Sequence, residues 1–191
     1  MRRRHARLYA AVPATAAIFS LYVALSAAWI PVKAEVAQWL IGRSWRHSLS
    51  GRVPEPPWPW ADTAPAALLR VPRHGVRLHV LRGASGRNLA FGPVVAAAGA
   101  DNADRVISGH RDTHFDFLRD LREGDLLEWT DRRGGAWYRV EELEIVDSRT
   151  HRLVIEPGIE RITLVTCFPF DGPATGGPLR YVVTAYPLRS R

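Results

Sequence analysis

The sequence predicts an all-β domain of about eight short strands, closed or nearly closed into a barrel and preceded by an N-terminal transmembrane helix. From about Ala66 onward the chain consists of short apolar runs separated by glycine and proline, which is typical of such a domain. Residues 8–30 contain no charged side chain. Hydrophobic residues make up 47% of the chain and charged residues 24%, as in ordinary globular proteins.

The uncharged segment from Leu8 to Ile30 is long enough to cross a bilayer, because a helix of this length spans roughly 35 Å. Arginines at positions 2, 3, 4 and 7 precede it, and only Lys33 follows closely. This asymmetry predicts a single-pass protein of the cell (inner) membrane, with its N-terminus in the cytoplasm and its folded domain periplasmic or otherwise extracytoplasmic. A signal peptide cleaved near residues 26–28 is the alternative. We favour a retained anchor because the apolar stretch exceeds the ~7–15 residues usual in signal peptides.

The net charge of +7 does not indicate binding to nucleic acid. Lys33 is the only lysine among the 26 basic residues, and the arginines are scattered along the chain rather than clustered in one segment. Because this lysine lies beside the membrane segment, a Walker phosphate loop and a lysine Schiff base in the folded domain are excluded.

Residues Lys33–Leu49 read as an amphipathic juxtamembrane helix. The predicted apolar side consists of Val36, Trp39, Leu40 and Trp45. The proline-rich stretch 54–60 follows, and we interpret it as a stiff spacer, with recognition by a proline-binding partner as the alternative. The predicted domains are residues 1–32 (basic tail and anchor), 33–65 (juxtamembrane helix and Pro/Trp-rich linker) and 66–191 (folded domain).

Short apolar runs define the predicted strands of the domain. They are Leu68–Val71, Arg77–Leu81, Arg105–Ser108, Asp125–Thr130, Ala136–Val146, Arg152–Ile155, Arg161–Cys167 and Tyr181–Tyr186. One short helix is predicted near His114 to Leu121, with Phe115, Leu118 and Leu121 as its buried stripe.

Cys167 is the only cysteine of the chain, so it forms no internal disulfide. In an exported protein a single cysteine suggests a free thiol or an intermolecular bridge, and a buried packing cysteine is the alternative. Cys167 ends a predicted strand directly before the loop at 168–170, where a side chain is held rigidly and still reaches solvent. A reactive thiol at this position needs a base or a cation nearby.

His110 is the strongest candidate for that base, because it begins a loop directly after a predicted strand that ends at Ser108. His114 is four residues further on, a spacing that on a helix would allow both to bind a metal. We expect no metal, because Arg111 would repel a cation and no second group of ligands is evident. His114 is expected to cap or pack the short helix.

Arg180 begins the last predicted strand, after a glycine-rich loop at 172–178. Acyl transfer from a thiolate develops negative charge on the carbonyl oxygen, and a fixed guanidinium stabilises that charge. The alternative is that Arg180 is a solvent-exposed arginine without a part in catalysis.

These three candidates occur in motifs that resemble those of sortases. Thr163-Leu-Val-Thr-Cys167 matches the family's Thr-Leu-X-Thr-Cys signature, and Ser108-Gly-His110 matches its histidine motif. Leu179-Arg-Tyr-Val-Val183 resembles its arginine-bearing strand, and the order His, Cys, Arg is also that of the family. The resemblance covers roughly Ala66 to Leu188.

The resemblance implies an eight-stranded sortase-type β-barrel with one or two short helices, and a cysteine transpeptidase. Cys167 would attack the Thr–Gly carbonyl of a sorting signal similar to Leu-Pro-X-Thr-Gly, and an amine acceptor would resolve the thioacyl intermediate. His110 would exchange protons with the leaving and incoming amines, and Arg180 would stabilise the oxyanion. Thr166 is expected to help hold the substrate. Asp112 is expected to contact substrate or orient His110, with a loop turn as the alternative.

No cofactor or metal is expected, since the sequence lacks the paired acidic loop of calcium-dependent sortases. Residues 109–115 and the arginine-rich, alanine-rich composition resemble proteobacterial sortases. No long lid region precedes the predicted barrel, although Trp58 and Trp60 are placed to fold over the site.

Two other functional classes remain open. A hydrolysing cysteine peptidase would use the same nucleophile with water as the acceptor. A membrane-anchored, non-catalytic binding module would explain the anchor and the linker, with Cys167 as a packing residue. The binding module predicts that Cys167→Ala leaves function intact and that the thiol resists alkylation.

Overall fold

A computed structural model of the chain describes residues 20–23, 26, 29, 32–33, 35–50, 55–83, 85–99, 103–172 and 177–188. The predicted membrane segment, Leu8–Ile30, lies mostly outside these residues. None of the helices within the described residues has the length and apolar character needed to cross a membrane. The chain divides into two compact units, Met1–Val36 and Ala37–Arg191, and the second contains the barrel.

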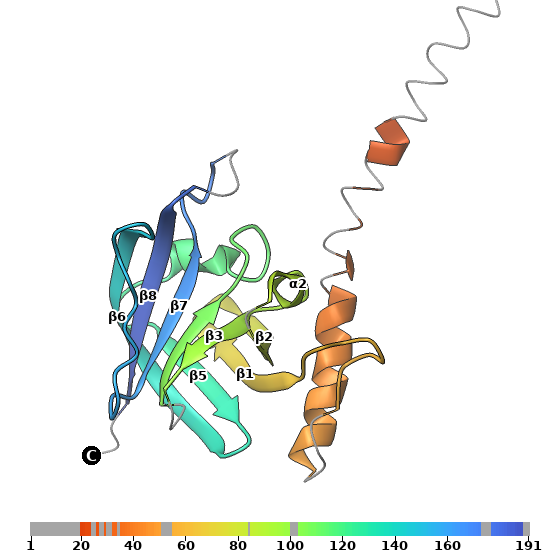
Figure 1. Cartoon of the computed structure of the whole chain (residues 1–191), viewed down its shortest axis with the longest axis horizontal. Coiled ribbons are helices and arrows are strands. Elements are labelled where there is room, and N and C mark those ends of the chain that lie inside the picture. The colour runs from red at the N-terminus through yellow and green to blue at the C-terminus, as the bar shows by residue number, and fades with distance from the viewer. Residues whose placement is uncertain are drawn as a thin grey trace, which may run out of the picture. The chain divides into compact units, whose positions relative to one another are not determined.

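Within the described residues, eight strands close into a barrel with the order β1-β2-β3-β4-β7-β8-β6-β5 (Figure 1). The strands are β1 (Pro65–Val71), β2 (Val76–Arg82), β3 (Val94–Ala98), β4 (Asp104–Ser108), β5 (Leu126–Asp131), β6 (Gly134–Asp147), β7 (Arg161–Cys167) and β8 (Leu179–Pro187). The pairs β2–β3 and β4–β7 are parallel, and the remaining pairs are antiparallel. The predicted eight-stranded barrel is therefore confirmed.

Alternating residues of the strands fill the barrel interior. In β7 these are Ile162 and Leu164, and in β8 they are Val183 and Ala185, all fully buried in one apolar cluster. The other members of this cluster come from most of the remaining strands and from the segment after β4: Ala67, Leu69, Val71, Val80, Ile107, Phe115, Leu118, Leu121, Leu127, Trp129, Tyr138 and Val140. The alternation leaves the intervening residues of β7 and β8 on the outer face of the wall.

A buried ion pair fixes the connection from β6 to β7. Asp104, the first residue of β4, is fully buried and accepts hydrogen bonds from Arg161 Nε at 2.9 Å and Nη2 at 3.0 Å. Its Oδ2 also accepts a hydrogen bond from the backbone N–H of Glu156 at 2.8 Å. Arg161 in turn donates to the Val154 carbonyl. The connection is thereby attached to the start of β4 and β7.

Substitution of Asp104 by asparagine is expected to lower the free energy of unfolding by about 3 kcal/mol, because it leaves the Arg161 guanidinium with a single carboxylate neighbour, the exposed Glu156. Urea unfolding at pH 7 measures this loss. Asp147→Asn is the matched control, since Asp147 pairs with an arginine, Arg149, whose side chain is 73% exposed. We expect little change there, and equal losses in the two variants would contradict the interpretation.

A helix formed by residues 35–49 packs its residues from Ala37 onward against the barrel wall. Gln38 Nε2 donates to the carbonyls of His79, at 3.3 Å, and Phe91, at 3.1 Å. Its Oε1 accepts from the His79 N–H at 2.9 Å. At Gly42 an added Cβ would lie 2.8 Å from Cε1 of the His79 ring, so this close approach requires glycine.

The apolar side predicted for this helix is wrong at two positions. Val36 is 52% exposed and Trp39 is 61% exposed, whereas Trp45 is buried as expected. The observed buried face is Ala37, Ile41, Ser44, Trp45 and Ser48. Two of its members are serines whose hydroxyls donate to backbone carbonyls, so the apolar pattern alone does not identify this face.

Trp58, one of the two tryptophans that could fold over the predicted site, packs elsewhere in the structure. The Trp58 ring packs edge-on against Phe91, with 4.8 Å between ring centroids, and joins the apolar cluster of Ile41 and Leu81 between the helix and the barrel. Trp60 is 79% exposed.

Seven of the eight predicted strands are confirmed, with small shifts at their ends. The predicted strand Arg152–Ile155 is wrong, because these residues form an irregular segment. The eighth strand is instead β3, Val94–Ala98, which the sequence reading missed. The predicted helix is a 3₁₀ helix, η2 (Asp116–Asp120), and its predicted buried stripe is confirmed. Two further short helices were not predicted, η1 (Pro72–His74) and α2 (Gly86–Leu89).

Candidate active site

Cys167 is the last residue of β7, and it lies on the outer face of the barrel. Ile162 and Leu164 point into the core, so the two-residue alternation of the strand places Val165 and Cys167 on the opposite side. Cys167 is half-buried and carries a free thiol. The strand therefore holds the thiol in a fixed place and leaves it accessible to solvent.

Arg180 lies directly opposite Cys167 on the neighbouring strand. The two are paired residues in the antiparallel ladder between β7 and β8. Directly opposite side chains share one face, with Cβ atoms about 4.5–5.5 Å apart. Arg180 Nη1 donates to the carbonyls of Gly177, at 2.6 Å, and Leu179, at 2.8 Å. These bonds hold the guanidinium against the backbone at the start of β8.

His110 lies on the other side of Cys167. Strand β4 runs parallel to β7, with Ser108 paired to Val165. One residue further, the Gly109 N–H donates to the Val165 carbonyl at 3.2 Å. His110 follows two residues beyond the end of β4 and is exposed. The same parallel register, continued by two residues, brings its backbone level with Cys167. The fold thus places the three predicted residues on the ends of three adjacent strands.

Gly109 is required by a close approach of an aromatic ring. A Cβ added at Gly109 would lie 2.6 Å from the ring of Phe115, which is fully buried in the core. The Phe115 N–H donates to the His110 carbonyl at 2.9 Å, and this bond closes the loop after β4. The glycine before the histidine therefore allows Phe115 to pack beneath His110.

Thr166 is buried and points away from the outer face that carries Cys167. Its hydroxyl donates to the Gly109 carbonyl at 2.8 Å. The side chain thereby links β7 to the residue before His110. Its predicted part in holding the substrate stays a prediction.

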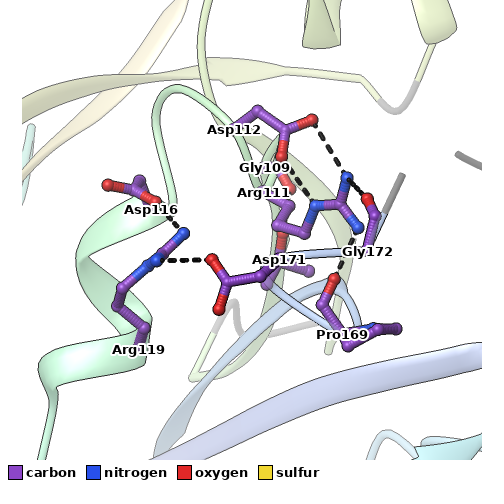
Figure 2. A network of polar contacts seen from close by, with 9 residues as sticks. Gly109, Arg111, Asp112, Asp116, Arg119, Pro169, Asp171 and Gly172 are labelled. Atoms are coloured by element: carbon purple, nitrogen blue, oxygen red, sulfur yellow. Dashed lines mark hydrogen bonds and ion pairs between the residues drawn. The ribbon is translucent and has the colours of Figure 1, made fainter. Parts of the chain in front are cut away.

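Arg111 holds the loop after Cys167, and the sequence reading missed this role. It is 6% exposed. Its Nη1 donates to the Pro169 carbonyl at 2.5 Å and its Nη2 to the Gly172 carbonyl at 3.2 Å (Figure 2). The only signal in the sequence is the acidic residue that follows Arg111, and adjacent Arg–Asp pairs are too common to indicate a loop contact by themselves.

Asp112 pairs with Arg111. Its carboxylate accepts from Arg111 Nε at 2.6 Å and from Nη2 at 3.3 Å. This hydrogen bond is the main reason that the pKa of Asp112 lies below its usual value, and the nearby charge of His110 contributes less. The predicted contacts of Asp112 with substrate or with the imidazole stay predictions.

A second arginine attaches the same loop to η2. Arg119 contacts Asp116 at 2.7 Å and Asp171 at 3.0 Å (Figure 2). Its guanidinium also lies over the ring of Phe170, 5.3 Å from the centroid. The Phe170 ring also packs edge-on against Tyr181 of β8, at 5.2 Å between centroids. The segment that follows Cys167 is thus held by ionic and aromatic contacts.

His114 is buried, as its predicted packing role requires. Its Nδ1 lies 3.2 Å from the Thr113 hydroxyl, and its Nε2 has no hydrogen-bond partner among the described residues. Burial, with a smaller contribution from the charge of His110, lowers the pKa of His114 to about 4. No group of three or more His, Cys, Asp or Glu residues in the described part of the chain is arranged to hold a metal ion.

The domain is expected to lose stability as the pH falls from about 6.5 to about 4, because the unfolded chain binds protons at His114 and His79 that the folded chain does not. Burial lowers the pKa of each from 6.5 to about 4. One pKa unit corresponds to about 1.4 kcal/mol, so the loss reaches roughly 3 kcal/mol for the buried His114 below that range. It is smaller for the partly exposed His79, whose charge is screened by solvent.

Urea unfolding at pH 7 and at pH 4.5 measures this loss. His114→Gln should flatten the dependence, and His151→Gln, at an exposed position, should leave it unchanged. Equal pH dependence in all three proteins would show that His114 is not a source of the loss.

The arrangement has the parts that acyl transfer requires. A thiol, an imidazole and a guanidinium come from β7, from the end of β4 and from β8, and they lie on one accessible face. A thiol acts as a nucleophile, an imidazole moves protons to and from departing and attacking groups, and a guanidinium stabilises an oxyanion.

Comparisons with known proteins agree with this geometry. The family model of the sortase domain matches residues 69–188. Sortase D of Bacillus subtilis (strain 168) is 33% identical over 84 residues, which are 44% of this chain and 42% of that protein. The chain thus matches less than half the length of this relative.

Solved structures of sortases share the barrel. Sortase A from Corynebacterium diphtheriae aligns with a TM-score of 0.58 and 24% identity, over 69% of this chain and 64% of that one. Sortase C-1 from Actinomyces oris aligns with a TM-score of 0.54 and 25% identity, over 68% of this chain and 77% of that one. Sortase A of Listeria monocytogenes aligns with a TM-score of 0.56 and 24% identity, over 65% of this chain and 88% of that one. With the family model matched over most of the chain, this protein belongs to the sortase family.

Proposed function

We propose that this chain is a cysteine transpeptidase, which cleaves a sorting signal and transfers the protein that carries it to an amine. The observation that supports this most directly is the placement of Cys167 at the end of the central strand of three, between His110 and Arg180. Cys167 and Arg180 are paired on one face of the β7–β8 ladder and His110 is exposed, so an extended peptide would have access to all three.

The reaction would proceed in two acyl transfers. The Cys167 thiolate attacks the carbonyl carbon of the scissile peptide bond, and the negative charge that develops on the oxygen lies near the Arg180 guanidinium. Collapse of this intermediate breaks the C–N bond, and His110 donates the proton that the leaving amine takes up. A thioacyl-enzyme remains. An incoming amine then loses a proton to His110, attacks the thioester and releases Cys167.

The substrate that we propose is a protein with a C-terminal signal similar to Leu-Pro-X-Thr-Gly, cut between Thr and Gly. The motif around Cys167 and the membership of the family support this choice. The resemblance of residues 109–115 to proteobacterial sortases supports assignment to that subgroup. The uncharged segment 8–30 supports a single membrane anchor, with the catalytic domain outside the cytoplasm and its partners at the same surface.

A peptide assay with the full chain in detergent tests this function. A fluorogenic library of Leu-Pro-X-Thr-Gly peptides is incubated with and without an amine acceptor such as triglycine, and the products are identified by mass spectrometry. The expected result is cleavage after Thr, with ligated product replacing hydrolysed product when the amine is present. Cleavage that gives acid with or without amine would favour a hydrolysing peptidase. Absence of any cleavage, together with a thiol that resists iodoacetamide, would favour a binding module.

A further inference from the structure

Two hydrogen-bonded links bracket Cys167 and His110 in the structure. On one side the Thr166 hydroxyl, one residue before Cys167, donates to the carbonyl of Gly109, one residue before His110. On the other side Arg111, one residue after His110, donates to the carbonyl of Pro169, two residues after Cys167. The catalytic pair thus lies between two links that join the same two segments of chain.

The imidazole of His110 depends on these links for its position. Among the described residues no hydrogen bond reaches its ring nitrogens. Its carbonyl accepts from Phe115, and its neighbours on both sides are bonded to the Cys167 segment. The backbone therefore fixes where the imidazole can lie relative to the thiol. A displacement of about 1 Å in such a pair costs up to about 10²-fold in rate.

Arg111 makes contacts that a lysine cannot reproduce. Its planar guanidinium donates at once to the Asp112 carboxylate, to the Pro169 carbonyl and to the Gly172 carbonyl (Figure 2). A lysine ammonium is a single point charge without this fork. Arg111 is also close enough to Cys167 for the thiolate to contribute to the raised pKa of the guanidinium, after the larger effect of the Asp112 hydrogen bond.

We propose that Arg111 is a positioning residue, whose fork locks the loop after Cys167 to the loop that begins at His110 and so sets the geometry of the catalytic pair. This inference rests on the proposed transpeptidase function. Asp112 holds the fork from one side while the two carbonyls of the loop occupy the other. Arg111 acts through His110 and Cys167, and it takes no part in the proton transfers.

The test compares Arg111→Lys and Arg111→Met with the wild type. Arg111→Lys keeps the positive charge near Cys167 and removes the fork, so a role for charge alone predicts that lysine restores the rate. The lock predicts that both variants lose about 10-fold or more in kcat, with KM within about 3-fold of the wild type. The matched control is Arg70→Met, which removes an arginine–carboxylate pair between β1 and β5 and should leave kcat unchanged.

A second readout separates this inference from the proposed function, because it needs no substrate. Amide hydrogen exchange of residues 109–115 and 168–172 should become faster in Arg111→Lys, while exchange in β1 and β5 stays as in the wild type. If the wild type transfers no peptide, the proposed function fails. The exchange measurement alone then tests whether Arg111 holds the two loops together. Unchanged exchange in Arg111→Lys, or a kcat within about 2-fold of the wild type, would overturn the proposal.

Discussion

Replacement of Cys167 by alanine is expected to abolish peptide cleavage and transfer, with a loss of at least about 10⁴-fold in kcat/KM. The proposed reaction passes through a thioester on this sulfur, and the chain has no second cysteine to replace it. Intact-mass spectrometry should show an acyl adduct in the wild type when peptide is present without amine, and no adduct in the variant.

The fold itself should tolerate this substitution. Cys167 is half-buried on the outer face and lies outside the apolar cluster that fills the barrel. The melting temperature of the Cys167→Ala variant should therefore stay close to that of the wild type. A folded Cys167→Ala variant that still cleaves peptide would exclude the thioester mechanism. If neither the wild type nor Cys167→Ala cleaves peptide and both still bind a partner, the non-catalytic binding module is favoured.

The sequence predicted the strands that carry the site because their patterns are strong. Four of the seven residues of β7 are β-branched, which favours a strand. The two-residue period of a strand then places Cys167 on the face opposite Leu164. Strands β4 and β8 are similarly rich in β-branched residues. The resemblance to the family's motifs also predicted the order of the three residues along the chain. The pairing of Cys167 with Arg180, in contrast, depends on the register between β7 and β8, which only the structure shows.

Strand β3 could not be predicted in this way, because its last three residues are alanines, which have low strand propensity. Its place in the barrel depends on pairing with β2 and β4 on either side. The opposite error occurred at Arg152–Ile155, where apolar residues suggested a strand. There Leu153 and Val154 are exposed, and the segment is held by the buried Asp104 through the adjacent Glu156.

The contacts that hold the site together were also beyond the sequence. In the sequence, Arg111 indicates only a charge that disfavours a metal, whereas its hydrogen bonds in the structure reach carbonyls 58 and 61 residues away. Backbone carbonyls are present at every residue, so no residue type marks Pro169 or Gly172 as acceptors. The same reasoning applies to Thr166, whose buried hydroxyl bonds to a backbone group of another strand.

Replacement of Arg180 by alanine is expected to lower kcat by about 10²–10³-fold, with a smaller effect on KM, because the charge that it stabilises develops only as the thiolate attacks. The structure supports this expectation in two ways. Arg180 is the paired neighbour of Cys167, and its Nη1 is held by the carbonyls of Gly177 and Leu179. Among the described residues its Nε and Nη2 donate to no other group.

Arg180→Lys distinguishes a fixed donor from a nearby positive charge. A lysine at this position retains the charge but lacks the second nitrogen that the guanidinium directs toward the oxyanion, so its kcat should lie between those of the wild type and the alanine variant. The matched control is Arg152→Ala, an exposed arginine of the β6–β7 connection, which should leave kcat unchanged. The rate of Cys167 alkylation by iodoacetamide gives the deciding comparison. If Arg180→Ala loses peptide transfer but its Cys167 is alkylated at nearly the wild-type rate, the guanidinium acts on the oxyanion. If the transfer rate and the alkylation rate fall by the same factor, the guanidinium acts on the thiolate instead, and its assignment to the oxyanion is wrong.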